Sequence, residues 1–415
     1  MTNEKAINKT SLTTIGDAQE ILRHHLECLW ANPEKAADLP PIMLWGPPGI
    51  GKSTVIRELA KELEIGFIDV RLAQREPVDI RGLPVPREDR QGVDWIVSSE
   101  WPREGQKDFN PKGIILFDEI TAADPSLQVA AYEFILDRRL GLLYDVPEGW
   151  YIVAAGNRTK DGAVARSMSS ALANRFCHLE LRSDANSWVE WGWNTGIHPS
   201  VLAFIRFRPD LLFNMNGDRE RGWPSPRTWA RVSLEMQMAE QTGLSNRALA
   251  HIIEGLIGIG ASIEFLGFMK WAEKLPDVGK VLRGEAEVFI PDRSDQKFAL
   301  ISAMVHHVLE EPHIGDIVNG VIDIMLAFTN DWCQMAYHDI ELTLTGRGRL
   351  DDLILLTTHS RHEELETKIL GAIPETEAST CLNQQKNYRL RRLLSQRKLM
   401  RLRRHACYSC GKKTG

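Results

Sequence analysis

The stretch PPIMLWGPPGIGKSTVIRELAKELE, residues 40–64, decides the fold of this chain. Its first apolar residues, 42–45, predict a buried strand, and the apolar spacing from Val55 onward predicts an amphipathic helix. Between them lies the pattern G-x-x-x-x-G-K-S, a phosphate-binding loop in its required setting between a strand and a helix. We therefore predict that nine residues hold a nucleotide: Gly46, Pro47, Pro48, Gly49, Ile50, Gly51, Lys52, Ser53 and Thr54.

The residue types in this loop suit that chemistry. Glycines allow backbone N–H groups to converge on phosphates, and the start of the helix adds its partial positive charge. Lys52 would reach the β- and γ-phosphates, and the Ser53 hydroxyl would ligate Mg²⁺.

A second strand supplies the carboxylates that such a loop needs. In KGIILFDEI, residues 112–120, four apolar residues lead to Asp118 and Glu119. Asp118 would hold the Mg²⁺ shell, directly or through water, and Glu119 would polarise the attacking water.

A third apolar run, YIVAAGN at residues 151–157, ends on Asn157. Ligands of open α/β sheets bind at the carboxyl ends of the strands, so Asn157 is expected beside the γ-phosphate. The segment SSALANRF follows at 169–176 and places Arg175 at the end of a short predicted helix.

Together with WPSPRTW at 223–229, these motifs resemble the AAA+ ATPases of the MoxR-like branch. The resemblance runs from about residue 15 to about residue 275. It implies an α/β fold: a P-loop AAA+ αβα parallel-sheet core, an α-helical lid and further C-terminal helices. It also implies ATP with Mg²⁺ as cofactors, Asn157 as sensor 1, Arg175 as arginine finger and Arg227 as the sensor 2 arginine.

An arginine at the far end of a helix leading away from Asn157 cannot easily serve its own subunit's nucleotide. Arg175 would therefore act on a neighbour, which implies an oligomeric ring, by resemblance a hexamer. Arg166, in the same stretch 151–176, is a rival for this role or a second residue acting in trans, and an ordinary solvated arginine at 175 is the plain alternative.

We expect four parts: a nucleotide-binding domain with an N-terminal helical linker (1–185), a lid (186–275), a helical C-terminal region (276–380) and a basic tail (381–415). Two inserts match the MoxR-like branch. One covers 71–105, and the other, 138–157, is expected to form a β-hairpin turning around 147–149. The resemblance implies that these inserts face the central axis of the ring and transmit the nucleotide state to clients, whereas the plain alternative is long surface loops.

The composition, with 43% hydrophobic and 26% charged residues, is typical of a soluble globular protein. The polar N-terminus shows no secretory signal, and six scattered cysteines fit a reducing cytoplasm. The longest apolar stretch, 252–269, contains two glutamates and many glycines, so we expect a buried helical hairpin there and no membrane span.

The net charge of −6 conceals an asymmetry. Residues 386–415 contain eleven Lys or Arg and no Asp or Glu, which leaves the rest of the chain at −17. This tail has the pattern of a basic amphipathic helix for nucleic acid, an acidic partner or an anionic surface, and a solvated disordered tail is the alternative. Cys407 and Cys410, with His405 and Cys381 nearby, make only half a zinc site.

The leading hypothesis is a ring ATPase that remodels or activates a protein client. By resemblance, it would work with a partner carrying a von Willebrand factor A domain. A motor or loader acting on nucleic acid through the tail is the second hypothesis. A nucleotide-gated scaffold with negligible turnover is the third, and the intact Glu119, Asn157 and Arg175 argue against it.

Deleting residues 386–415 should leave basal ATP hydrolysis largely unchanged, because every predicted catalytic motif precedes the tail. If the tail binds nucleic acid, the full-length chain should bind DNA or RNA with a steep salt dependence that the deletion removes. Filter binding at low and high salt measures this, and lack of binding at low salt would retire the nucleic-acid hypothesis.

Overall fold

A computed structural model describes residues 12–371, except 90, 159–160, 162–165, 167, 169, 216–220 and 273–275. The chain divides into two compact units. Unit 1 comprises the chain through Ser187 together with Leu212–Met215 and Pro224–Thr228, and unit 2 comprises Trp188–Leu211, Asn216–Trp223 and the chain from Trp229 onward. Every residue predicted to bind or hydrolyse nucleotide therefore belongs to unit 1.

Unit 1 is built on a parallel six-stranded sheet, which confirms the α/β fold class. The strands lie in the order β1-β10-β2-β9-β6-β3. Their bounds are β1 Leu12–Thr13, β2 Ile42–Trp45, β3 Gly66–Arg71, β6 Gly113–Asp118, β9 Trp150–Gly156 and β10 Cys177–Leu181. Because β9 lies between β2 and β6, the residue after β9 emerges between the phosphate loop and the carboxylate pair.

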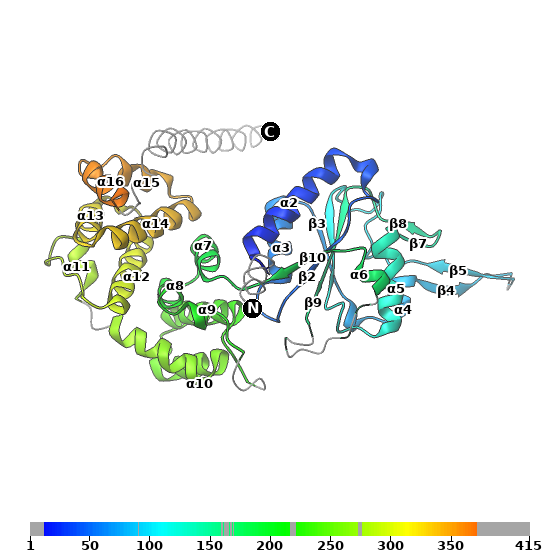
Figure 1. Ribbon diagram of the computed structural model, residues 1–415, viewed down its shortest axis with the longest axis horizontal. Coiled ribbons are helices and arrows are strands. Elements are labelled where there is room, and N and C mark those ends of the chain that lie inside the picture. Colours follow the sequence, from blue (N-terminus) through cyan, green and yellow to red (C-terminus); the bar gives the residue numbers. More distant parts are fainter. Residues whose placement is uncertain are drawn as a thin grey trace, which may run out of the picture. The chain divides into compact units, whose positions relative to one another are not determined.

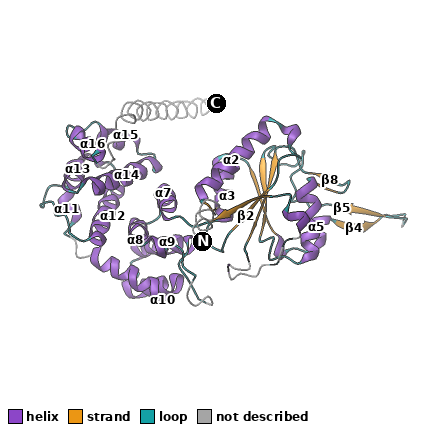
Figure 2. Ribbon diagram, viewed as in Figure 1, coloured by secondary structure: helices purple, strands orange, loops and turns teal. Residues whose placement is uncertain are grey.

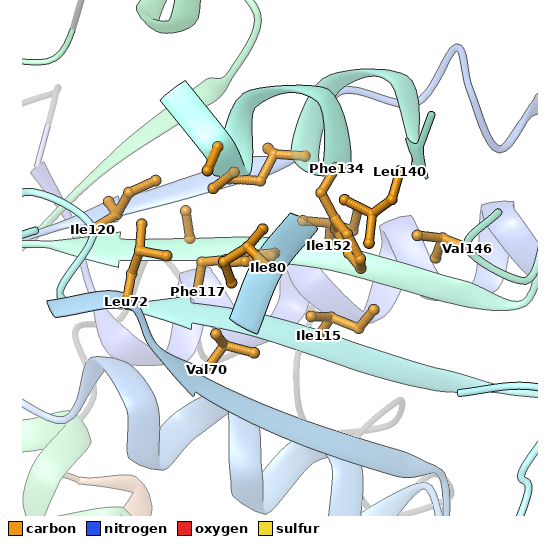
Figure 3. Close-up of a cluster of buried hydrophobic side chains, with 14 of the residues drawn as sticks. Val70, Leu72, Ile80, Ile115, Phe117, Ile120, Phe134, Leu140, Val146 and Ile152 are labelled. Atoms are coloured by element: carbon orange, nitrogen blue, oxygen red, sulfur yellow. The ribbon is translucent and has the colours of Figure 1, made fainter. Parts of the chain in front are cut away.

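Helices cover both faces of this sheet, as Figure 1 shows. On β6, Ile114 and Leu116 face a cluster that includes α2 (Ile15–Ala31) and α3 (Lys52–Glu62). Ile115 and Phe117 face the opposite cluster, formed with α4 (Pro77–Arg81) and α5 (Pro125–Asp137) and drawn in Figure 3. The two-residue period of a strand thus divides β6 between two cores, which explains its apolar run from Ile114 to Phe117.

Both predicted inserts contain a β-hairpin. Residues 71–105 contain α4 and an antiparallel hairpin of β4 (Leu83–Pro86) and β5 (Val93–Ile96), which projects from unit 1 in Figure 1. The second insert also forms a hairpin, β7 (Arg139–Leu140) with β8 (Tyr144–Asp145).

The predicted position of the second turn is wrong. The chain reverses at 141–143, where Gly141 has a φ of +52° and the Leu143 N–H donates to the Leu140 carbonyl at 3.0 Å. Residues 147–149 form a separate turn that leads into β9, with the Trp150 N–H on the Pro147 carbonyl at 2.9 Å.

The described part of unit 2 is helical (Figure 2). Its helices are α7 Ala185–Thr195 (shared with unit 1), α8 Pro199–Phe207, α9 Pro226–Thr242 (also shared), α10 Asn246–Ala272, α11 Val278–Leu282, α12 Ser294–Glu310, α13 Val318–Ala327, α14 Asn330–Gly346, α15 Leu350–Thr357 and α16 His362–Leu370. The predicted boundary at residue 275 falls inside this unit, where Arg206 on α8 pairs with the buried Asp339 on α14 at 2.5 Å. The four-part division stays a prediction, and the tail lies outside the described residues.

The expected buried helical hairpin at 252–269 is only partly found, because α10 comprises two helical segments that meet at a kink at Gly258, whose φ is +77°. One face is buried, with Phe265 against Phe204 at 5.1 Å between ring centroids. Ile259 and Ile263 are 55% and 65% exposed, so the helix is only partly buried. By length and composition alone α10 could cross a membrane, and its packed aromatic face is that of a core helix.

Candidate functional site

The phosphate loop has the backbone that a phosphate cradle needs. Gly49 and Gly51 have φ values of +86° and +108°, a region that L side chains rarely adopt. A Cβ on Gly49 would also lie 3.0 Å from the Ser225 Oγ. Gly51 is the N-cap of α3, so the first N–H groups of that helix lie directly after the loop. Glycine is therefore required at both positions by conformation, and at Gly49 by space as well.

Lys52 lies at the centre of the site and is buried, with 8% of its surface exposed. Its Nζ donates to the Gly46 carbonyl at 2.6 Å, the Pro47 carbonyl at 3.0 Å and the Asn157 Oδ1 at 2.8 Å. Burial lowers the pKa of Lys52 to about 8, although the carboxylates of Asp118, Asp161 and Glu119 oppose that shift.

The two predicted Mg²⁺ ligands are in direct contact, since the Ser53 Oγ donates to the Asp118 Oδ2 at 2.5 Å. The other carboxylate oxygen of Asp118 accepts the Glu119 N–H at 2.9 Å. Glu119 itself is exposed, and its φ of +55° lies in the left-handed region. For a non-glycine residue this conformation is strained, and strain of this kind is common at functional sites.

Asn157 follows β9, as predicted, and its backbone is held by Thr121. The Asn157 N–H donates to the Thr121 Oγ1 at 3.0 Å, and the same hydroxyl donates to the Asn157 carbonyl at 3.0 Å. The Asn157 side chain is thereby placed against Lys52. The structure thus brings together the predicted residues from β2, β6 and β9.

Arg227 also belongs to this site. Its N–H donates to the Gly49 carbonyl at 3.2 Å, and its positive charge contributes to the low pKa of Lys52. Ser225 and Thr228 exchange hydrogen bonds at the start of α9, with Pro226 as the first helical residue. Arg227 therefore lies in the first turn of α9, with its backbone against the phosphate loop.

The two arginines considered for the finger role differ in their contacts. Arg166 pairs with Asp124 of the same chain at 2.5 Å, and its N–H donates to the Thr121 carbonyl at 2.7 Å. Arg175 is exposed after α6 (Ser170–Ala173). Within the described residues, no ion pair of Arg175 is found.

Three further features near the site were not predicted from the sequence. Thr121 is the first, and Asp161, whose charge acts on Lys52, is the second. The third is a relay in which the Trp45 Nε1–H donates to the His178 Nδ1 at 2.8 Å, while the His178 Nε2 lies 2.7 Å from the Ala173 carbonyl. These contacts depend on which segments of the chain are neighbours in the fold, and no local sequence pattern predicts them.

The residues present fit a nucleoside triphosphate with Mg²⁺. The cradle offers backbone N–H groups and a buried ammonium group for phosphate oxygens. Ser53 and Asp118 offer the hard oxygen ligands that Mg²⁺ prefers, already side by side.

Comparison with known proteins identifies the domain. Residues 41–176 match the family model described as AAA domain (dynein-related subfamily). With this domain and an intact phosphate loop, the chain is an ATP-hydrolysing enzyme. No curated protein matched the chain.

Two solved structures are similar to this chain only at low TM-scores. The Holliday junction branch migration motor RuvB of Thermotoga maritima is 16% identical, with 63% of this chain and 77% of that chain covered and a TM-score of 0.33. A Cytophaga hutchinsonii protein is 11% identical, with 88% and 92% covered and a TM-score of 0.29. The fold class accordingly rests on the sheet topology and the domain match.

The low pKa of Lys52 predicts that ATP affinity falls above about pH 8. In the free enzyme the ammonium group loses its proton there, whereas bound phosphates raise its pKa in the complex. Affinity should therefore be full below that pH and fall by up to about tenfold per pH unit above it, with uptake of a proton on binding. Calorimetry near pH 9, in buffers of different ionisation enthalpy, measures this uptake.

Lys52→Arg is the matched control, because a guanidinium stays protonated throughout this range and should take up no proton. An ATP affinity of the wild-type enzyme that stays constant from about pH 7 to 9.5 would contradict the assignment of a low pKa to Lys52.

Proposed function

We propose that this ATPase works as a hexameric MoxR-like AAA+ ring and uses ATP hydrolysis to remodel or activate a protein client in the cytoplasm. The support is the motif set of unit 1, taken together with the resemblance of the five motifs to that branch. A partner with a von Willebrand factor A domain is part of this proposal and rests on the resemblance alone.

The chemistry follows from the described contacts. Glu119 would take a proton from the water that attacks the γ-phosphorus, while the bond to the β–γ bridging oxygen breaks and ADP leaves. Asn157 would orient that water or respond to phosphate loss, because its amide lies at Lys52. Mg²⁺ on Ser53 and Asp118 would neutralise charge that develops on the phosphate oxygens.

The contacts of the arginines support a ring. Arg227 is tied through its backbone to the phosphate loop of its own chain, and Arg166 is paired with Asp124 of its own chain. Arg175 is exposed at the end of a helix, so its guanidinium is available to a nucleotide held by a neighbouring subunit. We propose Arg175 as the arginine finger acting in trans, with a hexamer as the proposed assembly.

The observation that carries the choice of a protein client is the β4–β5 hairpin. Leu83, Val93, Trp95 and Ile96 are between 45% and 58% exposed on it. The stretch 83–96 contains two arginines and three carboxylates, so it offers no basic surface for a phosphate backbone. Exposed aromatic and aliphatic side chains on a projecting hairpin fit contact with protein instead.

Arg175→Ala should bind ATP almost as the wild type does but lose about 10³–10⁵ in hydrolysis rate, the usual contribution of an arginine finger. Mixing it with Lys52→Ala should partly restore activity. Some interfaces then pair the intact phosphate loop of one variant with the intact finger of the other. Steady-state ATPase assays of the separate and mixed variants measure this.

Arg166→Ala is the matched comparison, since it removes an arginine of the same segment that is paired within its own chain. Mixed rings that stay inactive, with their assembly verified by analytical ultracentrifugation, would remove the support for a finger in trans. Normal hydrolysis by Arg175→Ala alone would make Arg166 the leading residue.

Glu119→Gln should bind ATP normally and hydrolyse it about 10²–10⁴-fold more slowly, because it lacks the general base. Affinity purification with this variant and ATP should therefore retain a protein client. Adding Trp95→Ala should release the client without changing ATP affinity, because Trp95 lies on the hairpin and outside the nucleotide site. Retention of nucleic acid instead of protein would contradict the proposed client class.

A further inference from the structure

A buried hydroxyl links two of the site's strands. Thr121 lies two residues after Glu119, just beyond the end of β6, and is only 2% exposed. Its Oγ1 accepts the Asn157 N–H and donates to the Asn157 carbonyl, both at 3.0 Å. A threonine hydroxyl has one proton to donate and lone pairs to accept with, and both capacities are used on one residue.

This two-point contact fixes the backbone of Asn157 relative to β6. The next contact outward is the hydrogen bond from Lys52 to the Asn157 Oδ1 at 2.8 Å. Thr121 does not touch the phosphate loop in any described contact, so it can act on the site only through the residue it holds.

The chain makes room for this contact. A Cβ on Gly156 would lie 2.8 Å from the Thr121 Cγ2 and 2.9 Å from its Oγ1, closer than real side chains approach. The glycine before Asn157 thus lets the β9 backbone come close enough to Thr121. In addition, the Thr121 carbonyl accepts the Arg166 N–H at 2.7 Å. Thr121 therefore also holds the backbone at Arg166, nine residues before Arg175.

We propose that Thr121 is a positioning residue for ATP hydrolysis. Its hydroxyl holds the backbone of Asn157 so that the Asn157 amide keeps its place at the γ-phosphate end of Lys52. This inference rests on the proposed role of Asn157 in hydrolysis. A displacement of about 1 Å at such a group is enough to cost about 10²-fold in rate.

The test compares Thr121→Val with Thr121→Ser. Valine keeps the shape and removes both hydrogen bonds, so kcat should fall about 10- to 10²-fold while ATP affinity stays near that of the wild type. Serine keeps the hydroxyl and should retain most of the activity. Equal losses in kcat and in ATP affinity, or a wild-type kcat for Thr121→Val, would overturn the proposal.

A double-mutant cycle separates positioning from a general structural role. If Thr121 acts through Asn157, then Thr121→Val should cause no further loss of kcat in an Asn157→Ala background. Multiplication of the two losses would overturn the proposal, and so would a wild-type kcat for Asn157→Ala. Loss of activity in Glu119→Gln shows independently that the turnover measured belongs to this ATPase site.

Two further variants keep the test decisive if Thr121→Val folds poorly. Gly156→Ala should displace Thr121 without removing its hydroxyl, and should lower kcat to a degree similar to Thr121→Val. In an Asn157→Ala background, Gly156→Ala should cause no further loss of kcat. Ser233→Ala is the control. Ser233 is equally buried in unit 2 and accepts the His198 N–H at 2.7 Å, so its loss should leave kcat unchanged.

Discussion

The nucleotide site of unit 1 depends on one buried ammonium group. A charge as enclosed as that of Lys52 is costly unless oxygen atoms surround it, and three do. Two of them are carbonyls of the loop that Lys52 itself terminates, and the third is the amide oxygen of Asn157. The same group therefore fixes the curve of the phosphate loop and joins it to the end of β9. Phosphate oxygens can substitute for these acceptors, because they offer the same kind of partner with more charge.

The sheet makes this arrangement possible. β9 lies between β2 and β6, so the three strands that carry the loop, the amide and the carboxylates are neighbours with their carboxyl ends at one edge. Residues of alternating parity on β6 and β9 enter opposite cores, with helices on both sides. A shift by one residue would exchange the two sets of side chains, so packing on both faces fixes the register that aligns the site.

The sequence was informative wherever a motif is local. Gly49, Gly51, Lys52 and the pair after β6 could be placed because their spacing and their flanking apolar runs are contiguous in the chain. Arg227 came from the family resemblance, and the structure explains it by a helix that starts against the loop. Thr121 could not be found in this way, since a threonine after two carboxylates is ordinary until β6 and β9 are known to be neighbours.

The errors have the same origin. Many glycines in 252–269 suggested a buried helical hairpin, and two helical segments do meet at one of them, Gly258, but α10 is only partly buried. Pro147 and Gly149 have strong turn propensity and do form a turn, but the hairpin reverses earlier, at Gly141. Local propensity predicted the turn at 147–149 correctly, but that turn leads into β9, and the strands β7 and β8 are joined by the earlier turn at 141–143.

The left-handed backbone of Glu119 has a consequence for how the enzyme can change over evolution. Of the twenty residue types, glycine, asparagine and aspartate adopt this conformation at least cost, and glutamate does so only under strain of about 1–2 kcal/mol. Replacing it with glycine or asparagine would remove the base and relax the backbone together. Selection for stability alone would thus lead this chain toward a nucleotide-binding protein that no longer turns over, and only selection for activity retains the glutamate.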